Sequence, residues 1–275
     1  MASRHYDGAR GDFNVDDAPG DEHLEGTVDH VEFCRALEIE VARFASVLST
    51  LPMDQKVATC PGWSVGDLAE HLGVIHRWAE ELVRLRSPVR IARETSVEIR
   101  DAVSPEWIRE GGMKLVATLL AADPDDEMWA WGRDQHVRFW SRRQLHETLV
   151  HRMDLEFAAE VIPQAEPAIA IDAIDEFLSN IEKSGNYSPE LALLYGRGER
   201  LAFRVNNSET PWSITFGEGG FSVSKTDGNF NAELVGSPVD LLLVILRRRR
   251  VDQGNVEEIG DRQLVDYWLA HSDFD

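Results

Sequence analysis

The sequence is poor in cysteine and in long apolar runs. Its two cysteines, Cys34 and Cys60, lie outside any CxxC motif, so a disulfide framework is not expected and we predict that both are buried. The longest apolar run, residues 241–246, is far shorter than the ~18 residues of a transmembrane helix. The N-terminal stretch carries no hydrophobic signal region, and we therefore expect a cytoplasmic protein.

Basic residues are also scarce. The chain has 28 Lys and Arg against 49 Asp and Glu, a formal net charge of −21. Nucleic acids and anionic membranes would be repelled by such a surface, so neither is an expected partner. We expect a small-molecule substrate, a carboxylate or another electrophile, and a monomer or homodimer.

The hydrophobic period changes along the 275 residues and predicts two domains. Residues 1–27 are polar and rich in Gly and Asp, which favours a flexible tail. Residues 28–165 predict a four-helix bundle whose apolar faces include Val31 and Met113, and residues 166–190 predict a connecting helix. Residues 191–275 alternate in twos and predict a small α+β domain with a mostly antiparallel sheet.

Serine N-caps define the predicted start of three bundle helices. Ser64 is followed three residues later by Asp67, and Ser141 by Gln144, and each pair would complete a capping box. Ser104 directly precedes a proline, which favours the first position of a helix. The predicted helices are 28–51, 64–85, 104–121 and 141–160. The predicted strands are 201–205, 212–216, 221–224, 232–235 and 256–259.

Three residues of the bundle have the chemistry of a metal site. Glu147 and His151 are four residues apart and so share one helix face, and His71 lies on another helix. Two imidazoles and one carboxylate with a vacant fourth position are typical of catalytic zinc, although Ni²⁺, Fe²⁺ or Mn²⁺ would also suit these ligands. Asp67 precedes His71 by one turn and would either cap the helix or orient the imidazole. His146 and His151 are five apart, about 140° around a helix, which excludes the HExxH protease motif.

Three stretches of the sequence are distinctive: CPGWSVGDLAEHL, LHETLVHRMDLEFA, and VGSPVDLLLVILRRR followed by VEEIGDRQLVDYWL. Together they resemble the mycothiol-dependent maleylpyruvate isomerase family. The resemblance implies a DinB-like metal-binding four-helix bundle and a C-terminal domain similar to sterol carrier proteins. It also implies that His71, Glu147 and His151 hold a divalent metal, usually zinc. Arg248, within the run 247–250, would bind acidic substrate, unless these arginines only complement the helix C-terminus.

The resemblance implies a zinc-dependent enzyme that uses mycothiol, or a similar thiol, as cosubstrate. A thiol has a reference pKa near 8.5 and is deprotonated when it binds Zn²⁺, so a metal-bound thiolate would perform S-transfer or cis–trans isomerisation. Two alternatives stay open: a hydrolase that uses metal-activated water, and a non-catalytic regulatory protein on the same scaffold.

Several further side chains have predicted supporting roles. Trp63 is predicted to pack beneath the metal site, and Asp154 to support His151 or cap a neighbouring helix. We expect the active site in a cleft between the two domains. Two groups complete the predictions: tryptophans that line the mouth of this cleft or pack in the core or rim (Trp129, Trp131, Trp140), and histidines at the surface or in packing (His76, His136, His146).

Overall fold

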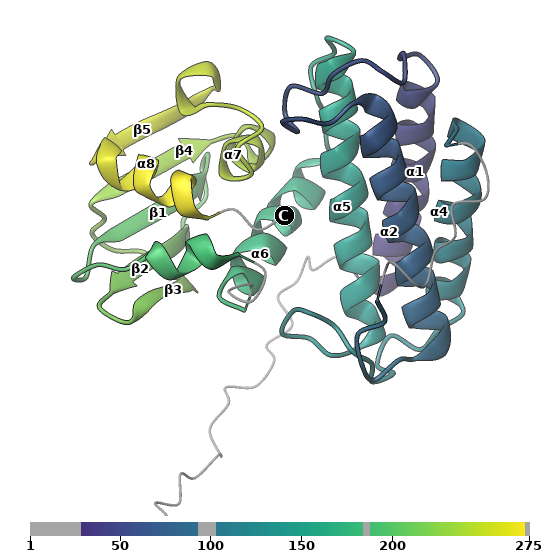
Figure 1. The fold of residues 1–275 in the computed structure, drawn as a ribbon. Coiled ribbons are helices and arrows are strands. Elements are labelled where there is room, and N and C mark those ends of the chain that lie inside the picture. The colour runs from purple at the N-terminus through teal and green to yellow at the C-terminus, as the bar shows by residue number, and fades with distance from the viewer. Residues whose placement is uncertain (1–28, 93–102, 184–187, 273–275) are drawn as a thin grey trace, which may run out of the picture.

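The computed structural model describes residues 29–92, 103–183 and 188–272, so the predicted tail, 1–27, lies outside the described residues. A helical bundle is followed by a small α+β domain, as Figure 1 shows, and the predicted fold class is confirmed. Within the described ranges, no helix combines the length and apolar character that crossing a membrane requires.

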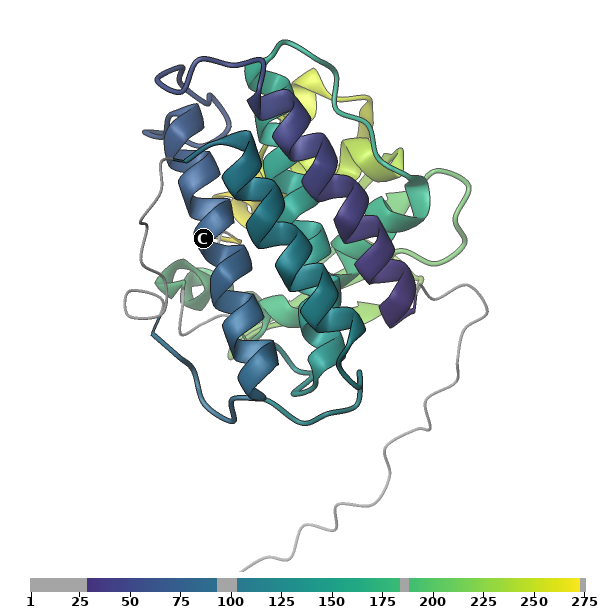
Figure 2. The ribbon, with the colours of Figure 1, turned by 90° about the vertical axis from the view of Figure 1, so that its right-hand side faces the viewer.

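Four long helices form the bundle and lie side by side in Figure 2. The predicted capping box of the second helix is present, because Ser64 accepts from the backbone of Asp67, whose carboxylate accepts from Ser64 in return. Ser104 likewise caps the third helix ahead of Pro105. The bounds are α1 (His30–Leu48), α2 (Val65–Leu85), α4 (Pro105–Leu120) and α5 (Val137–Ala158).

The predicted start of the fourth helix is wrong by one turn. α5 begins at Val137 with His136 as its N-cap, and Ser141 is fully buried inside the helix. The Ser141 hydroxyl donates to the Arg138 carbonyl and lies 2.9 Å from the ring of His30. A serine followed by a glutamine three residues later thus resembles a capping box, although both residues lie within the helix.

Two positions that were predicted to lie in the core are exposed, and the close packing of two helices explains why one position is glycine. Val31 and Met113 were predicted to be buried, yet their side chains are 40% and 41% exposed. Gly73 of α2 lies against Trp107 of α4, and a Cβ at Gly73 would approach the indole to 1.9 Å. Only glycine allows the two helices to approach this closely.

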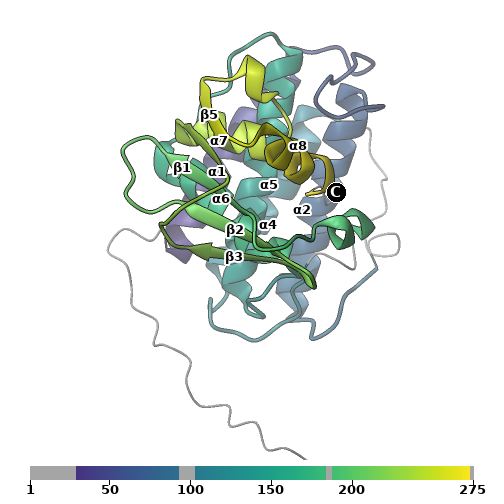
Figure 3. The same ribbon diagram turned by 90° about the vertical axis from the view of Figure 1, so that its left-hand side faces the viewer.

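The second domain is one five-stranded sheet with helices on it (Figure 3). The strand order is β3-β2-β1-β4-β5; β1 pairs with β4 in parallel, and the other pairs are antiparallel. The strands are β1 (Arg200–Val205), β2 (Trp212–Gly217), β3 (Gly220–Lys225), β4 (Ala232–Gly236) and β5 (Val256–Gly260), and the helices are α7 (Pro238–Ile245) and α8 (Arg262–His271). Two short 3₁₀ turns, Pro189–Leu193 and Val251–Gln253, complete the domain.

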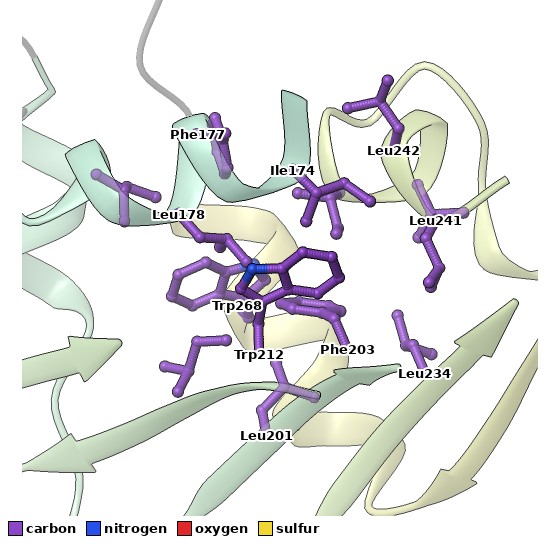
Figure 4. Close-up of a cluster of buried hydrophobic side chains, with 14 of the residues drawn as sticks. Ile174, Phe177, Leu178, Leu201, Phe203, Trp212, Leu234, Leu241, Leu242 and Trp268 are labelled. Atoms are coloured by element: carbon purple, nitrogen blue, oxygen red, sulfur yellow. The ribbon is translucent and has the colours of Figure 1, made fainter. Parts of the chain in front are cut away.

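Helix α6 (Pro167–Ile181) lies between α5 and the sheet (Figure 1). Its residues Ile174 and Leu178 point into the same buried cluster as Phe203 and Trp268, as Figure 4 shows. The opposite face of α6 meets α5 through charged groups, with Arg142 Nε 2.8 Å from a carboxylate oxygen of Asp172. The helix therefore supplies core to the sheet as well as connecting it to the bundle.

Candidate active site

Two imidazoles and one carboxylate meet in the bundle, facing the second domain. Glu147 Oε1 lies 3.1 Å from His71 Nε2 and 3.3 Å from His151 Nε2. One nitrogen or oxygen atom from each of the three residues lies within 4.8 Å of the other two. The structure thus brings together the three residues that the sequence selected from α2 and α5.

The segment before α2 positions His71. The turn at Pro61-Gly62 leads into Trp63, whose ring centroid lies 4.9 Å from that of His71 and 6.5 Å from that of His151. Trp63 packs against both imidazoles, as predicted. The Asp67 carboxylate accepts from the backbone and hydroxyl of Ser64, so of its two possible roles the structure supports the helix cap.

Glu147 has a partner on each of its two oxygens. Oε1 faces the two histidines, and Oε2 accepts from Arg143, which also donates to Glu176 of α6 at 3.0 Å. Burial alone would raise the pKa of Glu147, but Arg143 and the two imidazoles hold this pKa well below its ordinary value. Glu147 is therefore an anion with one oxygen directed at the histidines.

His151 is oriented by a carboxylate on its own helix. Its Nδ1 lies 3.0 Å from Oδ2 of Asp154, which is fully buried. Arg248 of the second domain donates to both oxygens of Asp154, at 3.2 and 3.3 Å, and the Cys60 thiol lies 3.4 Å from Oδ2. Burial alone would lower the pKa of His151, but hydrogen bonds to Asp154, Cys60 and Glu147 raise this pKa well above its ordinary value.

A second group of possible ligands, Cys60, His151 and Asp154, shares His151 with the first. Both Asp154 oxygens already accept from Arg248, so a cation there would lie beside the positive charge of a guanidinium. Cys60 is 9% exposed and, as predicted, buried. The arrangement favours a supporting role for Asp154 and leaves the first group as the better candidate.

The donor set of His71, Glu147 and His151 fits a divalent cation such as Zn²⁺. Ligand atoms at the usual ~2.1 Å from a tetrahedral zinc lie about 3.4 Å from one another. The two Nε2-to-Oε1 distances, 3.1 and 3.3 Å, are close to that separation. Nδ1 of His151 is engaged by Asp154, which leaves its Nε2 for a metal. Metal binding by these residues remains a prediction.

A cavity of about 630 Å³ opens over the cluster. Both domains line it: His71, Glu147 and His151 come from the bundle, and Arg247 and Arg248 follow α7. Trp129, Trp131 and Trp140 all face this cavity, and Trp140 is also buried in the bundle core. Sequence reasoning did not assign Trp78 and Gln144 to the cavity, although Gln144 precedes Glu147 by three residues on the same helix.

The other histidines of the prediction lie outside the cluster. His76 is fully buried with Nε2 2.8 Å from the Thr148 hydroxyl, and burial lowers the pKa of His76 to about 3. His146 is buried against Asp172 and Glu176, so it joins α5 to α6, the helix that packs on the sheet. His136 caps α5 by its backbone conformation and lies at the protein surface.

The fold and the cluster define a class of protein: a helical bundle with a histidine–carboxylate centre, joined to an α+β domain that lines the same cavity. Residues 34–156 match the family described as the mycothiol maleylpyruvate isomerase N-terminal domain. The resemblance to that family seen in the sequence is thereby confirmed over these residues.

Solved structures agree with this assignment in fold. A crystal structure of the mycothiol-dependent maleylpyruvate isomerase is similar with a TM-score of 0.55 and 13% identity, covering 83% of this chain and 93% of that one. A histidine-to-alanine mutant of the isomerase matches over the same shares with the same TM-score and 12% identity. A UbiJ-SCP2 ubiquinone synthesis protein covers 39% of this chain, with a TM-score of 0.28 that is too low to support an argument. No curated protein matches the chain.

Proposed function

We propose that the protein is a metal-dependent enzyme that uses mycothiol, or a similar low-molecular-weight thiol, for S-transfer or cis–trans isomerisation. The observation that carries the proposal is the cluster of His71, Glu147 and His151 at a cavity lined by both domains. The family match over residues 34–156 and the fold shared with a mycothiol-dependent isomerase support it.

We infer that His71, Glu147 and His151 hold the metal, with zinc as the expected ion. A divalent cation bound there would act as a Lewis acid that lowers the pKa of a thiol. Arg143 keeps Glu147 ionised and fixes the direction of Oε1, while Asp154 fixes the ring of His151. These contacts would preorganise the three donors before a metal binds.

We propose that Arg248 contacts an acidic group of the substrate. Its guanidinium lines the cavity, and Asp154 holds it in place through two hydrogen bonds. A planar guanidinium with several donors can keep these bonds and present a further N–H to a carboxylate. Arg249 pairs with Asp240 at 2.7 Å and Arg250 with Asp252 at 2.6 Å, and neither is among the described residues that line the cavity, which favours Arg248 over these two neighbours.

Metal content and thiol binding test the proposal. The purified protein should contain about one equivalent of divalent metal and bind mycothiol in calorimetry, and His71→Ala should reduce both. His136→Ala, which changes a histidine far from the cluster, serves as the control and should keep both. Unchanged metal content in His71→Ala would refute the ligand assignment. Hydrolysis of an ester without thiol, abolished by a chelator, would instead support the hydrolase.

A further inference from the structure

The cavity continues from the cluster along α5 to an apolar end. Trp78, Trp129 and Trp140 line this end, with ring centroids 5.4 to 6.0 Å apart in edge-to-face and tilted contacts. The indole N–H of Trp78 donates to the Ile91 carbonyl at 2.8 Å, and that of Trp140 donates to the Trp129 carbonyl at 3.1 Å. Because both N–H groups are already bonded, these two indoles offer the cavity apolar ring surface.

Among the polar side chains that line the cavity, Gln144 lies on α5 between Trp140 and Glu147. Gln144 is 2% exposed and lines the cavity, and its side-chain carbonyl oxygen has no hydrogen-bond partner among the described residues. A buried acceptor without a donor costs roughly 1–3 kcal/mol, so natural proteins seldom retain one without a use. Ser272, from the second domain, also lines the cavity with a buried hydroxyl that has no partner among those residues.

The spacing on α5 sets the order of these features. Trp140, Gln144 and Glu147 follow one another at intervals of four and three residues, so they share one face of the helix. At 1.5 Å per residue, Gln144 lies about 5 Å along the axis from Glu147, and Trp140 lies about 10 Å from it. A ligand that reaches from the cluster to the indoles therefore passes the Gln144 oxygen.

We propose that the cavity binds an aromatic electrophile that carries an N–H or O–H donor beside its ring. The ring packs on the indoles of Trp129 and Trp140, the donor binds the Gln144 oxygen, and the reacting carbon faces the cluster. A small aliphatic dicarboxylate would leave both the indole surface and the Gln144 acceptor unused. The description of the ligand as an electrophile rests on the proposed function, whereas its aromatic and donor character rests on the cavity alone.

Two probes that differ in one donor test this assignment: indole, which has an N–H, and 1-methylindole, which has none. Calorimetry and saturation-transfer NMR on the full chain, treated with chelator and without thiol, should show saturable binding of indole and several-fold weaker binding of 1-methylindole. Gln144→Met should weaken indole binding 3- to 10-fold, as the loss of one neutral hydrogen bond predicts, and change 1-methylindole binding less than 2-fold.

Two further variants complete the design. Gln263→Met makes the same change at an exposed position of α8 and should leave both affinities unaltered. Trp129→Leu should weaken both probes, because it removes ring surface and no acceptor. The absence of saturable indole binding would overturn the proposal, as would equal affinity for both probes with no effect of Gln144→Met. Because metal and thiol are absent, this result is independent of the test of the proposed function.

Discussion

Asp154 offers a sharp test of how the second domain supports the candidate metal centre. Its fully buried carboxylate accepts from His151 Nδ1 at 3.0 Å and from two nitrogens of Arg248. Asp154→Asn preserves size but removes the charge and replaces one acceptor oxygen with an NH₂ donor. That donor would face either the His151 N–H or the Arg248 guanidinium, so one of the two contacts must break.

The expected losses of zinc affinity and of stability in Asp154→Asn are large enough to measure. Removing a carboxylate that orients a metal-ligating histidine lowers metal affinity by about 10- to 100-fold, or roughly 1.4 to 2.8 kcal/mol. Arg248 has a side chain only 13% exposed and would lose its charged partner, which costs about 3 kcal/mol when a buried pair is broken. Zinc affinity and thermal stability of Asp154→Asn should therefore both fall.

Competition with a chromogenic chelator gives the zinc affinity, and calorimetric unfolding of the metal-free protein gives the stability. Asp240→Asn is the matched control, because Asp240 pairs with Arg249 at 2.7 Å and does not contact the cluster. It should lose some stability and keep its zinc affinity. If Asp154→Asn binds zinc within 2-fold of the wild type, the proposed support of His151 is refuted.

Three further predictions concern buried ionisable groups. Burial alone would raise the pKa of Glu176, but Arg143 and His146 lower this pKa to about 2, so the anion adds about 3 kcal/mol of stability above pH ~4.5. That stability is lost as the pH falls from ~4.5 towards 2, and denaturant titrations of the metal-free protein should show the loss. If a Glu176→Gln variant loses the same stability over this pH range, the loss does not come from Glu176. Glu40→Ala removes one of the two carboxylates that pair with the buried Arg152, at 2.5 Å, and leaves Glu156 in place. It should cost about 2 kcal/mol of unfolding free energy, as the loss of a hydrogen bond between charged groups predicts, and an unchanged unfolding free energy would argue against the pair. Burial, with a smaller effect of Asp29, raises the pKa of Cys34 to about 12, so this thiol should react with Ellman's reagent only in the unfolded protein, and rapid reaction of the native Cys34 thiol would contradict its burial.

Local patterns in the sequence were sufficient to predict that the helices and strands exist, and together with the family pattern they selected the three residues of the cluster. The one-turn spacing of Glu147 and His151 follows from helix geometry alone, and a histidine after the PGW turn could be matched to the family pattern. The start of α5 could not be predicted, because no residue in 137–140 opposes a helix and Ser141 has the same local pattern as a cap. Gln144 was therefore interpreted as a capping residue and its place in the cavity was missed.

The periodicity of the sequence could not predict the contacts that α6 makes with α5 and with the sheet. His146 seemed a surface or packing histidine, and only the fold shows that α6 brings Asp172 and Glu176 against it. The role of α6 was underestimated for the same reason. Its apolar face predicts a helix, but the sequence does not indicate that Ile174 and Leu178 would enter the core of a sheet formed later in the chain.

The arrangement around the cluster makes its geometry depend on both domains. Glu147 is oriented by Arg143, which α6 anchors through Glu176, and His151 is oriented by Asp154, which Arg248 anchors from beyond α7. Both chains of contacts begin on α5 and end outside the bundle. Because α6 shares its core with the sheet, a joint shift of α6 and the second domain would alter the direction of a carboxylate oxygen and of an imidazole ring at the same time, while His71, held by α2 and Trp63, would keep its place. Two of the three predicted ligands are thus oriented by contacts that end outside the bundle.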